Sequence, residues 1–257
     1  MKFLQSLAAQ VSLRTQGAIL ALGILFILLD LITEPMHPVI DLAWGTVIVC
    51  GLPLLINSVN SIWDNLEIHA NFLVVIAMVA LIAIGDYHTA AYVGIIVHAG
   101  FFLEQLITGD AHYTLDDDML PAMPAQLVAL RQGINNYSSV IVVAVMLLSM
   151  GSFALTQDFV HTVTLLLVLC PCSLELILVA LMMGSLVDDN SPVSELSKGA
   201  KQSHLGLLIV SILFHVAIIG TGVLGLIDPV TAVALHGLAR LGLVYNLKVL
   251  NGSLCIA

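Results

Sequence analysis

Apolar runs of about 20 residues recur along the whole chain, and they restrict its fold more than any other feature. At a helical rise of about 1.5 Å per residue, such a run crosses the roughly 30 Å hydrocarbon core of a bilayer. Hydrophobic residues make up 60% of the 257 residues and charged residues only 9%, which excludes a water-soluble domain. Helices satisfy their own backbone hydrogen bonds in lipid, so we expect an all-α fold, a polytopic membrane helical bundle.

The pattern predicts about eight transmembrane helices in a single membrane domain that covers residues 1–257. The predicted spans are about 17–33, 40–57, 70–85, 87–107, 138–155, 160–184, 202–224 and 229–249. The first run lacks a small-residue cleavage site, so we expect a retained helix and not a secretory signal. The two longer loops, 108–137 and 185–201, are too short to be catalytic domains, which typically need about 50 residues or more.

Lysine and arginine residues determine the predicted orientation, because positive charges near span ends are held in the cytoplasm. Most of the basic residues fall on one side of an eight-span chain: Lys2, Arg14, Arg131, Lys198, Lys201 and Lys248. The loops on the other side, at 34–38, 85–87, 156–159 and 226–228, contain none. We therefore expect both termini and both longer loops in the cytoplasm, and a multi-pass location in a bacterial inner membrane. The net charge of −10 comes without a basic patch, so no nucleic-acid partner is expected.

Cys170, Pro171 and Cys172 lie inside the predicted span 160–184. Proline removes a backbone hydrogen bond from a helix, at about 3 kcal/mol, so the helix is expected to kink or unwind there. An unwound helix lets two thiols that are two residues apart face one cavity, and thiolates bind copper, zinc or cadmium. The alternative is a tolerated proline kink with two small buried side chains.

The segment 165–177, LLLVLCPCSLELI, resembles the Cys-Pro-Cys helix of heavy-metal-transporting P-type ATPases. The Gly51-Leu52-Pro53 segment, the pair of spans from 71 to 104 and the last span, 232–250, are similar to the corresponding parts of that family. The family's actuator motif, Thr-Gly-Glu, and its phosphorylation motif, Asp-Lys-Thr-Gly-Thr, do not occur in this chain. The resemblance therefore implies a metal-transporting membrane core without ATPase domains, which is not an enzyme.

Two histidines occupy the positions where zinc- and cadmium-transporting members of the family carry a lysine and an aspartate beside the two cysteines. Counting back from Asn246, these positions hold His236 and His215. The resemblance thus implies a ligand set of Cys170, Cys172, His215 and His236, and it leaves the identity of the metal open. Two thiolates and two imidazoles form an ordinary tetrahedral zinc site, and copper is the other candidate.

Depth in the membrane supports the same residues independently of the resemblance. At about 1.5 Å per residue from the outer span ends, Cys170 lies about 16 Å deep, His215 about 14 Å and His236 about 12 Å. Ionisable groups at such a depth are expensive and usually functional. His98 comes out at about 16 Å, but for a lone histidine the favoured alternative is an imidazole bonded to the carbonyl of a neighbouring helix.

Glu175 is a further possible ligand, because it follows Cys172 by three residues and so lies near the same helix face. It either adds charge to the site or pairs with Arg240.

Two classes of function follow from these observations. The chain binds zinc or another transition metal and passes it through the bilayer passively or with a partner, or it is a pseudo-transporter, a structural subunit of a larger membrane complex. In either class another membrane protein or a second copy of the chain is a possible partner.

Overall fold

The computed structural model describes residues 13–33, 42–65, 71–108, 125–170 and 194–255. All regular elements within these ranges are helices, so the all-α class is confirmed for them. They are α2 (Leu13–Thr33), α3 (Ala43–Asn65), α4 (Asn71–Ala83), α5 (Tyr87–Thr108), α6 (Ala125–Thr156), α7 (Phe159–Val168), α9 (Ser194–Val223) and α10 (Pro229–Cys255).

Five of the described helices contain a stretch that is long and apolar enough to cross a membrane. The stretches are Leu13–Thr33, Ala43–Trp63, Tyr87–Ile107, Ser139–Thr156 and Leu205–Val223. These five helices indicate a multi-pass membrane protein. The shorter helices α4 and α7 are apolar as well, and the remainder of the predicted span 160–184 beyond Cys170 lies outside the described residues. Helix α10 is long but carries His236, Arg240 and Asn246, polar residues that lower its mean hydropathy.

Helices α3, α6 and α9 extend well beyond the spans predicted from hydropathy, and α3 continues to Asn65, past the predicted end at about 57. Helix α6 begins at Ala125 and α9 at Ser194, so each takes up the later part of a predicted loop, 108–137 or 185–201. The physical reason is that hydropathy marks only the part of a helix that lies in lipid. The backbone hydrogen bonds that maintain a helix continue equally well through a polar sequence in water.

Two helical hairpins, α4–α5 and α9–α10, are built in the same way. Gly85 and Gly225 follow the first helix of each pair with φ of 84° and 69°, a left-handed conformation that glycine adopts without strain. The next N–H groups, of Asp86 and Leu226, reach back to carbonyls in the last turn of the preceding helix at 2.9 and 3.0 Å. This is the Schellman arrangement, and it reverses the chain within a few residues.

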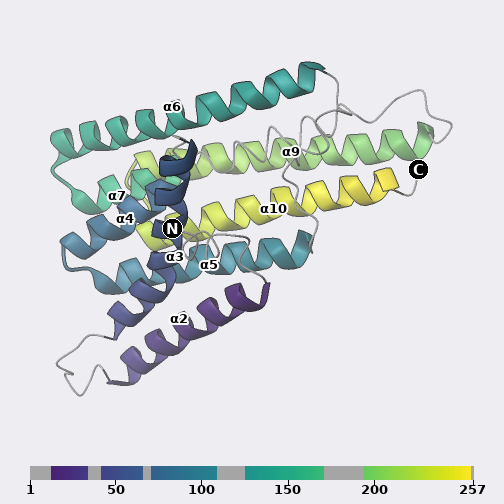
Figure 1. Ribbon diagram of the computed structural model, residues 1–257. Coiled ribbons are helices and arrows are strands. Elements are labelled where there is room, and N and C mark those ends of the chain that lie inside the picture. Colours follow the sequence, from purple (N-terminus) through teal and green to yellow (C-terminus); the bar gives the residue numbers. More distant parts are fainter. Residues whose placement is uncertain (1–12, 34–41, 66–70, 109–124, 171–193, 256–257) are drawn as a thin grey trace.

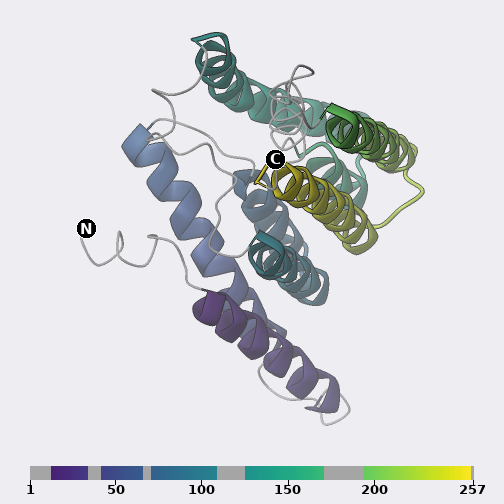
Figure 2. The same ribbon diagram turned by 90° about the vertical axis from the view of Figure 1, so that its right-hand side faces the viewer.

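Helix α10 packs between α5 and α9 and also contacts α7 (Figure 1). Helix α4 is buried on nearly every side, through Leu73, Val74, Val75, Ala77, Met78 and Leu81, and forms the centre of the main apolar core. Helices α2 and α3 form a pair that packs against α5, and α3 runs more steeply than the other helices in Figure 1. The pair lies on the side of α5 opposite α9 and α10 (Figure 2). The three helices α7, α9 and α10 therefore meet on one side of the core, where the candidate site lies.

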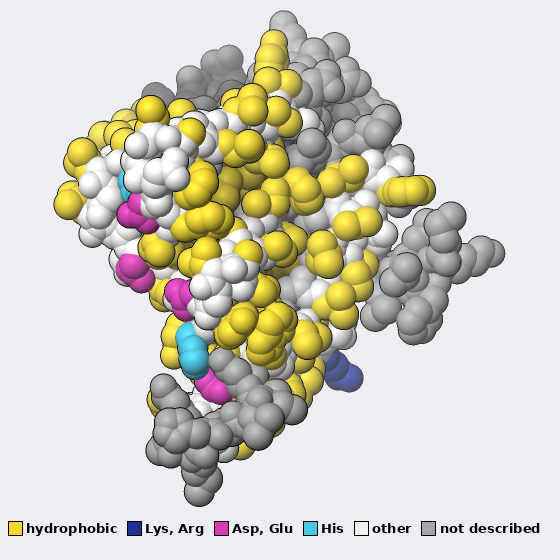
Figure 3. Space-filling model, turned by 90° about the vertical axis from the view of Figure 1, so that its left-hand side faces the viewer, with side chains coloured by type: hydrophobic (Ala, Val, Ile, Leu, Met, Phe, Trp, Pro, Cys, Tyr) yellow, Lys and Arg dark blue, Asp and Glu magenta, His cyan; other side chains and the backbone are white. Residues whose placement is uncertain are grey.

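The turns α4–α5, α6–α7 and α9–α10 lie at the same end of the molecule, on the left in Figure 1. Seen from that end, aspartate, glutamate and histidine side chains lie among hydrophobic ones (Figure 3). Asp158 caps α7 by accepting the N–H of His161 at 3.0 Å. Asp30, which is buried, accepts the N–H of Leu42 at 3.0 Å and pairs with His88 at 2.9 Å, and so connects α2, α3 and α5.

Candidate metal site

Cys170 is placed by the end of helix α7. The helix begins at its Asp158 cap, runs through the buried residues Val163–Val168, and ends at Leu169, its C-cap. Pro171 follows in the sequence, and a proline ring clashes with the carbonyl four residues before it, which favours a helix end here. Cys170 therefore lies just beyond the last helical residue, and only 6% of its surface is exposed.

His236 and His215 lie next to each other on the neighbouring helices α10 and α9. Their ring centroids are 5.6 Å apart and the rings meet edge to face at 85°. Each histidine is only 7% exposed. Two imidazoles that the resemblance and the estimated depths both indicated are thus brought together between two packed helices.

The ring of His215 is held in one tautomer by its own helix. Its Nδ1 lies 2.8 Å from the main-chain oxygen of Ser211. Because a carbonyl oxygen can only accept a hydrogen bond, Nδ1 carries a proton, and in the neutral ring Nε2 then carries the lone pair. Metal-binding histidines commonly have this arrangement, in which one ring nitrogen donates to a backbone carbonyl and the other ligates the metal. Nε2 is therefore the atom through which His215 can bind a metal ion.

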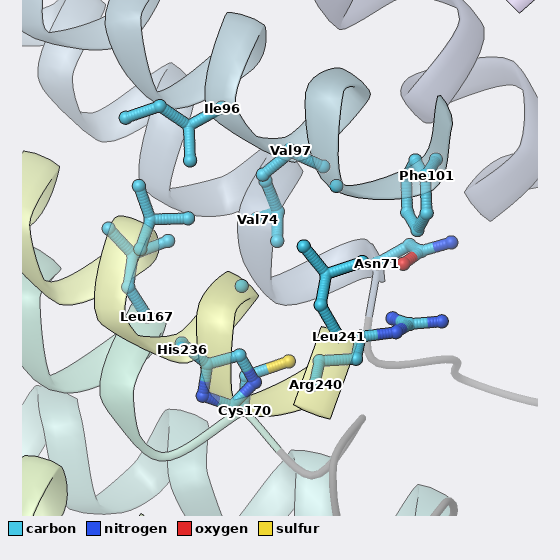
Figure 4. Close-up of a pocket in the computed structure, with 13 residues that line it drawn as sticks. Asn71, Val74, Ile96, Val97, Phe101, Leu167, Cys170, His236, Arg240 and Leu241 are labelled. Atoms are coloured by element: carbon cyan, nitrogen blue, oxygen red, sulfur yellow. The ribbon is translucent and has the colours of Figure 1, made fainter. Parts of the chain in front are cut away.

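Cys170 and His236 line one cavity of about 50 Å³ (Figure 4). Most of its wall is apolar, and the polar side chains that reach it are those of Asn71, Cys170, His236 and Arg240. The volume exceeds the roughly 15 Å³ that one water molecule needs, so an ion together with a little water fits. His215 does not line this cavity but contacts the ring of His236.

His98 faces away from this cavity. Its Nε2 lies 2.7 Å from the main-chain oxygen of Cys50 on α3, and its neighbours Ile96 and Val97, but not His98 itself, line the cavity. This hydrogen bond to a neighbouring helix is the alternative interpretation favoured for a lone histidine in a span. His98 therefore joins α5 to α3 and does not lie with His215 and His236.

Arg240 forms an ion pair with Glu104 of α5, at 3.0 Å between Nη2 and Oε2. The sequence suggested Glu175 as a partner for Arg240 and did not connect Arg240 with Glu104. Two isolated opposite charges in separate apolar spans are the signal that points to this pair, because charges at membrane depth usually pair with one another.

Cys172 and Glu175 lie outside the described residues. In the part of the chain that is described, no three histidine, cysteine or acidic side chains converge closely enough to hold a metal ion. The structure thus places the rings of His215 and His236 in contact, and it places Cys170 and His236 around one cavity, without a three-ligand group among the described residues. Comparisons of the chain with protein-family models, with curated proteins and with solved structures find no match.

Proposed function

We propose that the chain binds a transition-metal ion between α7, α9 and α10 and conducts it across the membrane. The observation that carries the proposal is the meeting of Cys170 and His236 in one cavity, with His215 against His236. A packing role requires neither a thiol nor imidazoles at this position, and polar groups inside a membrane bundle are usually functional.

The ligands of the proposed site are Cys170, Cys172, His215 and His236. Cys172 supplies the second thiolate, two residues after the first. Thiolate and imidazole together suit zinc, cadmium and copper, whereas magnesium and calcium prefer oxygen ligands. The ion is therefore zinc or a related soft transition metal.

The proposed topology has eight spans with both termini in the cytoplasm of a bacterial cell. The antiparallel course of the helices supports it, since the turns without lysine or arginine lie together at one end of the molecule (Figure 1). The starts of α6 and α9 and the end of α10 lie towards the other end. Positive charge near these inner ends is what the positive-inside rule requires.

The proposed transport is driven by the metal gradient or by a partner protein. Phosphoryl transfer needs a positioned nucleotide, magnesium ligands and an acceptor carboxylate, and the motifs that supply them are absent from the sequence. We therefore expect no ATP hydrolysis by this chain.

The test is a comparison of site variants with matched controls in the purified, reconstituted chain. Cys170→Ala and His236→Gln remove proposed ligands, while Cys50→Ala and His98→Gln remove a buried cysteine and a buried histidine outside the cavity. We expect about one zinc or copper ion per wild-type chain, in line with a tetrahedral four-ligand site, and retention in both controls. Metal content and gradient-driven zinc flux into vesicles should both drop at least tenfold in the two site variants.

The outcomes separate the two classes of function. Loss of metal from the two site variants, with metal retained in the two controls, supports the proposed site. Equal metal content in all variants contradicts it. A wild-type chain that binds metal but shows no flux favours a non-conducting membrane subunit instead.

A further inference from the structure

The ion pair between Arg240 and Glu104 borders the same cavity as the proposed ligands. The Nη2 atom of Arg240 lies 3.0 Å and 3.3 Å from the two carboxylate oxygens of Glu104. The guanidinium carbon also lies 5.4 Å from the centroid of the Phe101 ring. Arg240 and Phe101 both line the cavity, together with Cys170 and His236 (Figure 4).

Arg240 is close enough to the ligand positions to act on them electrostatically. It follows His236 by four residues on α10, which places the two side chains on one helix face about 6 Å apart along the axis. A guanidinium stays protonated in proteins, so its charge is permanent. Only a quarter or less of each partner's side chain is exposed, so solvent screens the pair weakly.

We propose that the Arg240–Glu104 ion pair sets the net charge of the cavity and thereby allows it to hold a cation. This inference rests on the proposed function. With both residues present, the carboxylate cancels the positive charge one turn away from His236. Without Glu104, the remaining guanidinium repels a metal cation. Without Arg240, the remaining carboxylate attracts the cation more strongly than the intact pair does.

A purely structural ion pair makes a different prediction. Removing either partner deprives the other of this counter-ion and destabilises the contact between α5 and α10 in the same way. Both single variants would then weaken metal binding. The direction of the two effects, opposite or the same, therefore distinguishes charge control from structural support.

The experiment measures Zn²⁺ and Ag⁺ affinity of the purified full chain by competition with a chelator of known affinity. We expect Glu104→Gln to weaken Zn²⁺ binding at least tenfold and Arg240→Gln to strengthen it at least threefold. The double variant, which restores neutrality, should fall within threefold of wild type. Each effect should be smaller for Ag⁺, because electrostatic energy scales with the charge of the ion.

Glu104→Asp keeps the carboxylate and serves as the matched control, with an expected Zn²⁺ affinity within threefold of wild type. Thermal unfolding of every variant identifies a chain that has not folded. Changes of the same direction in both single variants, or effects on Ag⁺ as large as those on Zn²⁺, overturn the inference while the metal site stands. A folded wild-type chain that binds neither ion overturns the proposed function as well.

Discussion

At the residue scale, the hydrogen bond of His98 is one interaction between α5 and α3 that a single substitution can remove. Its Nε2 donates to the Cys50 carbonyl of α3 at 2.7 Å. His98→Leu leaves that carbonyl without this donor, and we expect the free energy of unfolding to fall by about 1 kcal/mol. His98→Gln, which keeps an N–H donor, should lose less. Thermal unfolding in detergent measures both, and a leucine variant as stable as wild type would contradict the expectation.

The sequence allows an estimate of how deep each histidine lies in a span, but it does not reveal the direction in which each side chain points. His98 and His236 are both buried histidines inside spans, and their estimated depths differ by about 4 Å, less than one helical turn. What separates them is the rotation of each helix about its axis, which packing decides. The same limit explains why Arg240 was not assigned to Glu104. Opposite charges in two spans suggest a pair, but only the packing of α5 against α10 selects the partner.

At the element scale, α7 and α9 approach closely at Gly222. A Cβ atom added there would lie 2.9 Å from Cγ2 of Val168, a β-branched side chain with little rotational freedom. We expect Gly222→Ala to lower the free energy of unfolding by about 1 to 3 kcal/mol through overpacking. Val168→Ala in the same chain should recover much of this loss. Chemical denaturation in detergent measures the change.

Gly220 supplies the matched control on the same helix. A Cβ atom added there has no neighbour within 4 Å, so Gly220→Ala should be neutral or should stabilise by up to about 1 kcal/mol through helix propensity. Equal losses from both substitutions would show that close packing is not what Gly222 provides.

The positions of the helices and several of their ends could be predicted from apolar runs, whereas the starts of α6 and α9 could not. Each of the eight described helices overlaps a predicted span, because burial in lipid requires an apolar sequence of that length. Ala125 and Ser194 begin helices inside predicted loops because helical hydrogen bonding does not depend on hydropathy. Gly85 and Gly225 are recognisable stop signals, since glycine favours the left-handed conformation after a helix.

At the scale of the whole molecule, the proposed topology predicts which positions a membrane-impermeant thiol reagent reaches. With the native cysteines replaced by alanine, single cysteines at Gln157 and Leu226, in the turns of the outer end, should react in intact cells. Cysteines at Ser6, Ser194 and Lys248 should react only after permeabilisation, because the positive-inside rule places them in the cytoplasm. Labelling of a cysteine introduced at position 194 or 248 in intact cells would contradict the eight-span arrangement.

The position of Cys170 just after the end of α7, and of His236 within α10, has an electrical consequence in the proposed topology. An ion bound about 12 to 16 Å from the outer end has crossed roughly half of the hydrocarbon core, and so about half of the membrane potential. Moving one elementary charge through 100 mV involves about 2.3 kcal/mol, so a divalent ion gains about that amount over half the field. Since about 1.4 kcal/mol is tenfold in an equilibrium constant, occupancy from outside changes about 50-fold. If the proposed site binds a metal ion, we expect its binding to be sensitive to voltage, before any ion has completed the crossing.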